Sequence, residues 1–206
     1  MAESQQPNDH LSIIKETKSL NIHHVYITNS IDDPSKYANL LQLLNTADDD
    51  DRIIMYINSP GGSLPTAMQI VNAMVKCKAP VTTVIDGVAH SAASLIFLST
   101  SSTEVRAGSC MCCHFFSQLT WGKAHEVKAN VNFMESFYKK LFDALYSGFL
   151  TDDELKRMYK GEDFWFDSEE ILRRLGNRKR EFFKAKKLVE KGMKIEQPKK
   201  SKKGGK

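Results

Sequence analysis

The segment Gly87–Leu98 (GVAHSAASLIFL) contains two serines one helical turn apart, Ser91 and Ser94, and His90 directly precedes the first. Ser91 falls in the first turn of the helix expected after the strand Val81–Ile85, where unpaired N–H groups and the helix dipole favour a developing negative charge. Taken alone, a serine at a helix start is more often a cap than a nucleophile. Ser94 is expected to bond back to a carbonyl one turn earlier and to stay buried.

A second candidate element is the turn Asn58–Ser63 (NSPGGS), which follows the apolar strand expected at Ile53–Ile57. Adjacent glycines let the backbone approach a substrate closely and aim its N–H groups outward. The N–H groups of Gly62 in this turn and of Ala92 after Ser91 are therefore candidate oxyanion donors.

A nucleophilic serine also needs a base and a group that orients the base. His90 is a poor base for Ser91, because adjacent side chains on a helix diverge by ~100°. His114 ends an apolar strand, where a polar ring must find a partner or face a cleft. Asp163, in a short aromatic-rich link, is the best-placed acid, whereas Asp167 is better explained as a helix cap.

The elements that must position these residues follow from apolar spacing. Strands alternating with helices predict an α/β fold with a parallel sheet and right-handed crossovers. The continuous apolar run Ile53–Ile57 predicts a strand buried on both faces. Strands are expected at 24–28, 53–57, 81–85, 103–106 and 110–115. Helices are expected to begin at Pro34, after Ser63 and after Gly87, and to run over about 123–146. Two more are expected, one starting at the capping box Thr151–Glu154 and one running from Asp167 to about Gly176.

Length and composition favour one domain with flanking segments. The chain has 206 residues and 41% hydrophobic content, enough for one sizeable core. We expect a polar N-terminal segment at 1–21, a folded domain at 22–176 and a basic, partly disordered extension at 177–206. The extension carries 13 Lys/Arg and 3 Glu, a net charge of +10, whereas the other 176 residues carry 16 basic and 22 acidic side chains, a net charge of −6.

Composition also predicts the compartment. No stretch approaches the roughly 20 apolar residues that span a bilayer, and the polar N-terminus lacks the order of a signal peptide. The four cysteines, three of them crowded at Cys110, Cys112 and Cys113, form a poor disulfide framework. We therefore expect a cytoplasmic protein with no membrane partner.

Three segments together resemble a known family. YINSPGGS is close to the signature of the proteolytic subunit of the Clp protease, GVAHSAAS is similar to its nucleophile segment, and DFWFDSEEI followed by LG resembles its catalytic aspartate segment. The resemblance covers about Ile22 to Gly176. It implies the ClpP/crotonase fold, built of stacked ββα units with a protruding long helix, and a serine endopeptidase acting on protein or peptide substrates.

The resemblance also implies the site residues. Aligning on Gly87 puts the nucleophile at Ser91, 29 residues after Gly62, and the base and acid fall on His114 and Asp163, 49 residues apart, without gaps. The implied catalytic triad is Ser91, His114 and Asp163, with Gly62 and Ala92 as the oxyanion hole and no metal or organic cofactor.

Several positions depart from the family pattern. CHFF replaces an Ile-His-Gln-Pro-like sequence at the histidine, and Glu162 replaces a commonly basic residue that serves ring–ring contacts. The N-terminal segment does not resemble axial pore loops. The resemblance is thus to a divergent, phage-type member that forms a homo-oligomeric ring, with an AAA+ unfoldase partner left open.

Alternatives remain for several features. Within the same fold, an acyl-thioester hydratase or isomerase, or an inactive scaffold, would use the Gly62 turn without the full triad. Cys110–His114 formally matches the C-x-x-C-H haem pattern, and a zinc site could use the same cluster, but strand neighbours alternate faces. The basic extension is either a solvated tail or a contact for nucleic acid or an acidic partner.

Overall fold

The computed structural model describes residues 20–117 and 120–178. The elements in chain order are β1 (Ile22–Thr28), the 3-10 helix η1 (Pro34–Tyr37), α1 (Ala38–Thr46), β2 (Arg52–Ser59), α2 (Leu64–Lys76), β3 (Val81–His90), α3 (Ala92–Phe97), β4 (Ser102–Val105), β5 (Cys110–Cys113), α4 (Ala124–Tyr146), α5 (Asp152–Met158) and β6 (Phe164–Asp167). A further helix begins at residue 168 and its described part runs to 178. The expected N-terminal segment and basic extension lie almost entirely outside the described residues.

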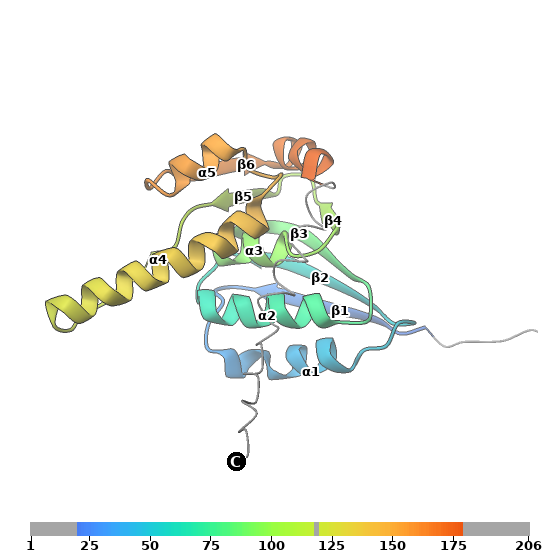
Figure 1. The fold of residues 1–206 in the computed structure, drawn as a ribbon. Coiled ribbons are helices and arrows are strands. Elements are labelled where there is room, and N and C mark those ends of the chain that lie inside the picture. Colours follow the sequence, from blue (N-terminus) through green and yellow to red (C-terminus); the bar gives the residue numbers. More distant parts are fainter. Residues whose placement is uncertain (1–19, 118–119, 179–206) are drawn as a thin grey trace, which may run out of the picture.

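One sheet organises the fold. Its strands run in the order β1-β2-β3-β5-β6, and β4 pairs with β3 beside that path. The pairs β1–β2, β2–β3, β3–β4 and β3–β5 are parallel, whereas β6 pairs antiparallel with β5. Together with the family match reported below, this arrangement confirms the α/β fold class. In Figure 1, α1, α2 and α3 lie along one face of the sheet, and α4 projects away from the body.

The sheet is covered more fully on one face than on the other. In β2, Ile53, Met55 and Ile57 are fully buried, but Ile54 and Tyr56 between them are only half-buried. On the neighbouring edge strand, Tyr26 is 64% exposed. The expectation that Ile53–Ile57 is buried on both faces is therefore wrong, because the helices pack mainly against one face and strand side chains alternate.

The other boundaries are close to expectation, with four differences. The strand expected at 81–85 continues as β3 to His90, so Ser91 is the N-cap residue of α3 and does not lie in its first turn. Part of the aromatic-rich link expected around Asp163 forms the strand β6. The residues expected as strands at 103–106 and 110–115 form β4 and β5, which both pair with β3 and not with each other. The last helix does not close near Gly176 but continues to at least residue 178. Its continuation is explained by Arg178, which is 3% exposed and therefore belongs to the packed body.

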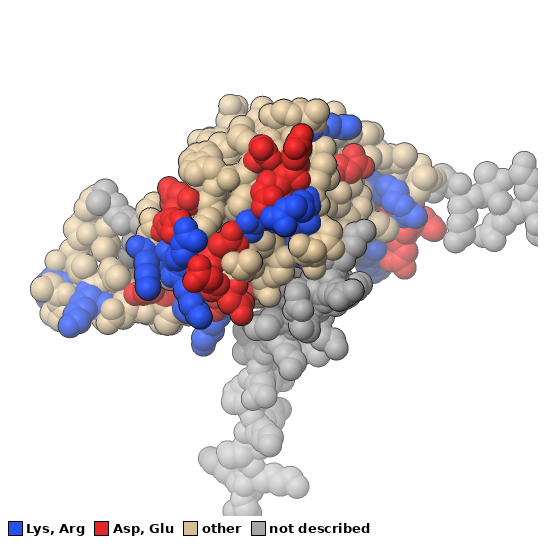
Figure 2. Space-filling view, turned by 90° about the horizontal axis from the view of Figure 1, so that it is seen from above, with Lys and Arg blue, Asp and Glu red and all other residues tan. Residues whose placement is uncertain are grey.

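Charged side chains of both signs are mixed on the surface around α5 and the last helix. Figure 2 shows acidic and basic groups next to each other on this face and not in separate patches of one sign. Within the described residues, no helix is long and apolar enough to cross a membrane.

Arg178 joins the C-terminal ends of two helices. Its guanidinium donates hydrogen bonds to the carbonyls of Leu98, the C-cap of α3 (2.6 Å), and of Leu145 in the last turn of α4 (2.7 Å). Such carbonyls lack partners within their own helix, so a buried cation satisfies them. Burial lowers the pKa of Arg178 to about 10, which still leaves it charged at neutral pH.

We predict that Arg178→Ala destabilises the fold by roughly 3 kcal/mol, since it leaves buried carbonyls without a charged donor. The shift should appear in urea or thermal unfolding followed by circular dichroism. Arg173→Ala, which removes a 64% exposed side chain, is the matched control and should change stability little. Equal unfolding midpoints for the two variants would contradict this role for Arg178.

Candidate active site

Ser91 occupies a strained junction between β3 and α3. Its backbone has φ 54° and ψ −125°, one of two positive φ values outside glycine in the described residues. Such a conformation costs on the order of 1–3 kcal/mol and persists only where the surroundings enforce it. The Ser91 N–H donates to the carbonyl of Cys112 in β5 (2.9 Å). A strained strand–turn–helix junction of this kind presents the nucleophile in α/β-hydrolases, so Ser91 is a candidate for that role.

The Ser91 side chain does not cap its helix. An N-cap residue has extended backbone angles and accepts a hydrogen bond from the second or third helical N–H. Ser91 has neither that conformation nor a side-chain cap bond. Within the described part of the chain its half-buried hydroxyl makes no hydrogen bond. Helix capping, the usual structural role of a serine at a helix start, therefore does not explain this residue.

Ser94 behaves as its position predicted. It is fully buried, and its hydroxyl donates to the carbonyl of Ser91 (2.6 Å) and accepts from the hydroxyl of Tyr146 (2.7 Å). Because the buried Ser94 hydroxyl already donates one hydrogen bond and accepts another, it is not available for attack. The geometry therefore favours Ser91 over Ser94 as the candidate nucleophile.

The glycine turn packs directly against this junction. Gly61 has φ 93°, and a Cβ on it would lie 2.5 Å from the carbonyl oxygen of His90 and 2.7 Å from the Ser91 Cβ. Gly62 forms a parallel bridge with Ile31, in which Ile31 bonds to the residues on either side of Gly62. In that pattern the Gly62 N–H points away from Ile31, which leaves it free to serve as an oxyanion donor.

Asn58 is a positioning residue that sequence reasoning missed. The β2–β3 register shifts between Ile57↔Ile85 and Ser59↔Ala89, so β3 bulges just before Ser91. The Asn58 Oδ1 accepts the N–H of Val88 (3.2 Å) inside this bulge, in place of a ladder bond. The only sequence signal was the asparagine at the start of the turn, and its partner could not be identified before the register was known.

The backbone brings the His114 and Asp163 positions together. In the antiparallel β5–β6 pair, Cys113 lies opposite Phe164. His114 directly follows β5 and Asp163 directly precedes β6. On the other side of β5, the Cys112 carbonyl holds Ser91. Segments far apart in sequence thus meet at one end of the sheet.

The side chains themselves are not joined in a triad. The His114 Nδ1 donates to the carbonyl of Phe115 (2.6 Å), which leaves Nε2 as the acceptor of the neutral ring. Asp163 is exposed, and its charge lies close enough to help raise the pKa of Cys112. Among the described residues, no hydrogen bond links His114 with either Ser91 or Asp163.

The cysteine cluster divides between the two faces of β5. Met111 and Cys113 point into the core, whereas Cys110 and Cys112 alternate with them. Cys110 and Cys113 therefore cannot hold one haem or metal together in this strand. Within the part of the chain that the structure describes, no group of three or more His, Cys, Asp or Glu side chains is arranged to hold a metal ion.

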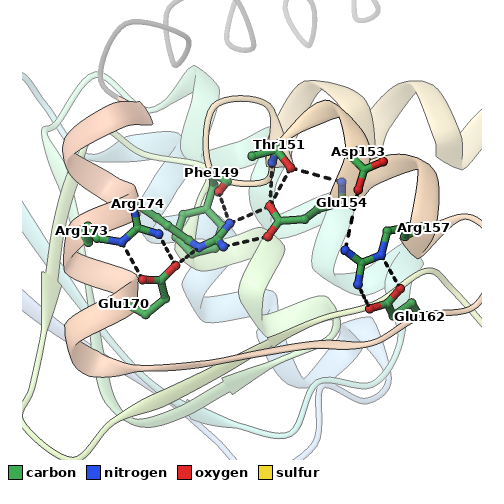
Figure 3. Close-up of polar contacts among 9 residues, drawn as sticks. All are labelled: Phe149, Thr151, Asp153, Glu154, Arg157, Glu162, Glu170, Arg173 and Arg174. Carbon is green, nitrogen blue, oxygen red and sulfur yellow. Dashed lines mark hydrogen bonds and ion pairs between the residues drawn. The ribbon is translucent and has the colours of Figure 1, made fainter.

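A partly buried ionic network supports the segment that carries Asp163. Arg174 in the last helix pairs with Glu154 of α5 (2.7 Å) and Glu170 (2.6 Å), and donates to the Phe149 carbonyl. Figure 3 shows Arg174 between the two carboxylates, with Arg173 on the outer side of Glu170. The network ties α5 and the last helix together on either side of β6.

Two further contacts complete this support. Glu162, next to Asp163, pairs with Arg157 of α5 (Figure 3), so the acidic residue that departs from the family pattern makes an ion pair within the chain. Asp167 accepts the N–H of Glu170 (2.9 Å), which confirms its expected role as a helix cap.

The fold and the site define an α/β protein with a candidate nucleophile at a strained strand–helix turn. Residues 8–173 match the family model of the Clp protease. Because this match spans most of the chain, the protein belongs to the Clp protease family.

Individual relatives carry the same family name. The chain is 38% identical over 79 residues to the ATP-dependent Clp protease proteolytic subunit 3, chloroplastic, of Arabidopsis thaliana, a match covering 37% of this chain and 26% of that protein. It is 39% identical over 79 residues to the ATP-dependent Clp protease proteolytic subunit 1 of Rhodococcus jostii, a match covering 37% of this chain and 36% of that protein. The match to the ATP-dependent Clp protease proteolytic subunit of Borreliella afzelii is 24% identical over 155 residues and covers 72% of this chain and 78% of that protein. The first two matches thus span about a third or less of those relatives.

The ionic network predicts how stability depends on pH. Hydrogen bonds from Arg174 lower the pKa of Glu154 from its ordinary value of 4.5 to about 2. A carboxyl whose pKa is depressed by folding adds stability above its unfolded pKa and loses it as the pH falls through the folded pKa. We therefore expect the contribution of Glu154 to be complete above pH 5 and to disappear as the pH falls from 4.5 towards 2.

The variant Glu154→Gln tests this expectation. Breaking this partly buried pair should cost roughly 2 kcal/mol at pH 7, and the variant should lose less stability than wild type between pH 5 and 2.5. Thermal unfolding across this pH range measures both effects. Glu135→Gln, at an exposed position on α4, is the control and should follow wild type. Parallel stability curves for wild type and Glu154→Gln would exclude the proposed linkage.

Proposed function

We propose that the protein is a serine endopeptidase in which Ser91, His114 and Asp163 form the catalytic triad. The observation that carries the proposal is the strained Ser91, whose hydroxyl neither caps its helix nor bonds to another described residue. Family membership supports the same reaction class.

Acylation begins when the Ser91 Oγ attacks the carbonyl carbon of a peptide bond. The His114 Nε2 takes the hydroxyl proton and returns it to the leaving amine, and the C–N bond breaks. The N–H groups of Gly62 and Ala92 hold the negatively charged oxygen of the tetrahedral intermediate. As the first residue of α3, Ala92 has no acceptor for its N–H within the helix.

Deacylation repeats these roles with water. His114 takes a proton from the water as its oxygen attacks the acyl carbon, and then protonates the Ser91 Oγ as the ester bond breaks. Asp163 holds the Nδ1–H during both steps. This requires the His114 ring to exchange the Phe115 carbonyl for the Asp163 carboxylate. The pairing of Cys113 with Phe164, which adjoin these two residues, supports that exchange.

The expected assembly and partners form part of this proposal. We infer a homo-oligomeric ring that encloses the site and admits protein or peptide substrates, with an AAA+ unfoldase as an optional partner and a cytoplasmic location. On α4, Phe133 (62% exposed) and Phe137 (53% exposed) stack with ring centroids 5.9 Å apart. Exposed stacked aromatic rings on a projecting helix are suited to an interface between subunits.

An acyl-thioester hydratase or isomerase, or an inactive scaffold, remains the alternative within the fold. Such a protein would use the Gly62 N–H but would not need an unbonded hydroxyl at Ser91. Reaction of Ser91 with a serine-directed probe distinguishes the two classes.

We predict that a fluorophosphonate probe labels Ser91 of the full-length protein, because a basic imidazole and an oxyanion hole make that hydroxyl nucleophilic. Ser91→Ala should abolish labelling and lower peptide hydrolysis at least about 1,000-fold. Mass spectrometry of digested, probe-treated protein locates the adduct.

Ser94→Ala is the matched control for this experiment. It removes the neighbouring hydroxyl and its bond to Tyr146, yet labelling at Ser91 should persist. An adduct on Ser94, or an unlabelled wild-type protein, would contradict the proposed nucleophile.

The inferred ring predicts a solution mass that is a multiple of 23.3 kDa. Replacing both Phe133 and Phe137 by Ser should lower that mass, because it removes the exposed aromatic pair. Light scattering after size-exclusion chromatography measures the change. Lys128→Ser, on the same helix, should leave the mass unaltered. A wild-type monomer would rule out the ring, and an unchanged mass for the double variant would rule out this interface.

A further inference from the structure

Cys110 and His90 form a side-chain pair beside the candidate nucleophile. The His90 Nε2 lies 3.3 Å from the Cys110 Sγ, within hydrogen-bonding distance for sulfur, and both residues are half-buried. We propose that this pair is a thiol-modification site, at which Cys110 reacts with soft carbon electrophiles and small-molecule disulfides. The part of the inference that concerns inhibition rests on the proposed peptidase function, whereas the reactivity of Cys110 does not.

Strand alternation places the pair on the face that carries the candidate site. Met111 and Cys113 point into the core, so Cys110 points to the opposite face. His114 directly follows the strand. In β6 the core residues are Phe164 and Phe166. Trp165 and Asp167 alternate with them and are exposed on that same opposite face. Asp163 directly precedes the strand and is also exposed.

Trp165 holds the imidazole in place. Its ring lies against His90 in an edge-to-face arrangement, with centroids 5.0 Å apart. Such aromatic pairs add roughly 0.5–1.5 kcal/mol beyond the burial of area. The ring of His90 thus lies between an indole and a thiol.

Burial disfavours the reactive thiolate at the other three cysteines. Burial raises the pKa of Cys112 to about 12 and also raises the pKa of Cys113, and each is at most 2% exposed. Burial raises the pKa of Cys77 as well. Because the thiolate is the reactive form, the one cysteine in contact with a base is the one expected to react first.

The reaction at Cys110 is a proton transfer followed by substitution at carbon or sulfur. Burial and the neighbouring His114 lower the pKa of His90, which favours the uncharged ring that can accept the thiol proton. The thiolate then displaces halide from an alkylating agent, or a thiolate from a disulfide. In the second case the proton on His90 passes to the departing thiolate, so the step needs no additional oxidant.

A group attached to Cys110 would stand close to the candidate catalytic residues. His90 directly precedes Ser91, and the Ser91 N–H is bound by the carbonyl of Cys112, two residues along the strand from Cys110. An adduct that displaces His90 therefore presses on the junction that positions Ser91. It also occupies the face that a peptide must approach, so modification should inhibit the reaction proposed for Ser91.

The first test measures thiol reactivity in the full-length protein. Iodoacetamide is added for timed intervals, and mass spectrometry follows the alkylation of each cysteine, with glutathione disulfide as a second reagent. Cys110 should react about 10-fold or more faster than Cys77, Cys112 or Cys113, and His90→Asn should slow Cys110 by a similar factor. Equal rates for the four thiols, or an unchanged Cys110 rate in His90→Asn, would overturn the proposal.

The second test measures the effect on Ser91. Treatment with iodoacetamide should abolish subsequent fluorophosphonate labelling of wild type, and should leave Cys110→Ser labelled. Loss of labelling in both proteins would overturn the inhibitory role of Cys110, as would retention in both. If untreated protein is never labelled at Ser91, the proposed peptidase function fails, while selective alkylation of Cys110 still supports the thiol site.

Discussion

The strained backbone at Ser91 is the constraint on which the rest of the site depends. A non-glycine residue at φ 54° is unfavourable in isolation, so neighbouring segments must enforce it. They do so from both sides, because the Cys112 carbonyl binds the Ser91 N–H and Gly61 fits against its Cβ. The absence of a side chain at Gly61 and the adjacency of β5 to β3 are therefore conditions for presenting this hydroxyl.

The reversal of direction between β5 and β6 is the second condition. A parallel sheet alone would not return the chain to the end of β5, but the antiparallel β6 pairs Phe164, the residue after Asp163, with Cys113, the residue before His114. That strand is held by α5 and the last helix, which Arg174 joins through Glu154 and Glu170. The geometry of the candidate acid thus depends on ion pairs that take no part in the proposed chemistry.

The face opposite the core combines two kinds of reactive group. The thiol of Cys110 lies on β5 and the candidate base His114 directly follows that strand. His90 on β3 contacts Cys110, and Trp165 on β6 packs against His90. Since strand side chains alternate, the core residues of the same strands secure the fold while the outer residues remain available for chemistry. One short strand therefore serves both packing and reactivity.

Much of this protein could be read from residue pattern alone. The apolar periodicity predicted nearly every helix and strand, the burial of Ser94 followed from its place one turn inside a helix, and Asp167 was identified as a cap, because these properties depend on local sequence. Pairing between distant segments is not a local property. Four features depend on which segments lie side by side, so only the three-dimensional packing could decide them. They are the β3 bulge filled by Asn58, the less covered face of β2, the continuation of the last helix to Arg178 and the His90–Cys110 contact.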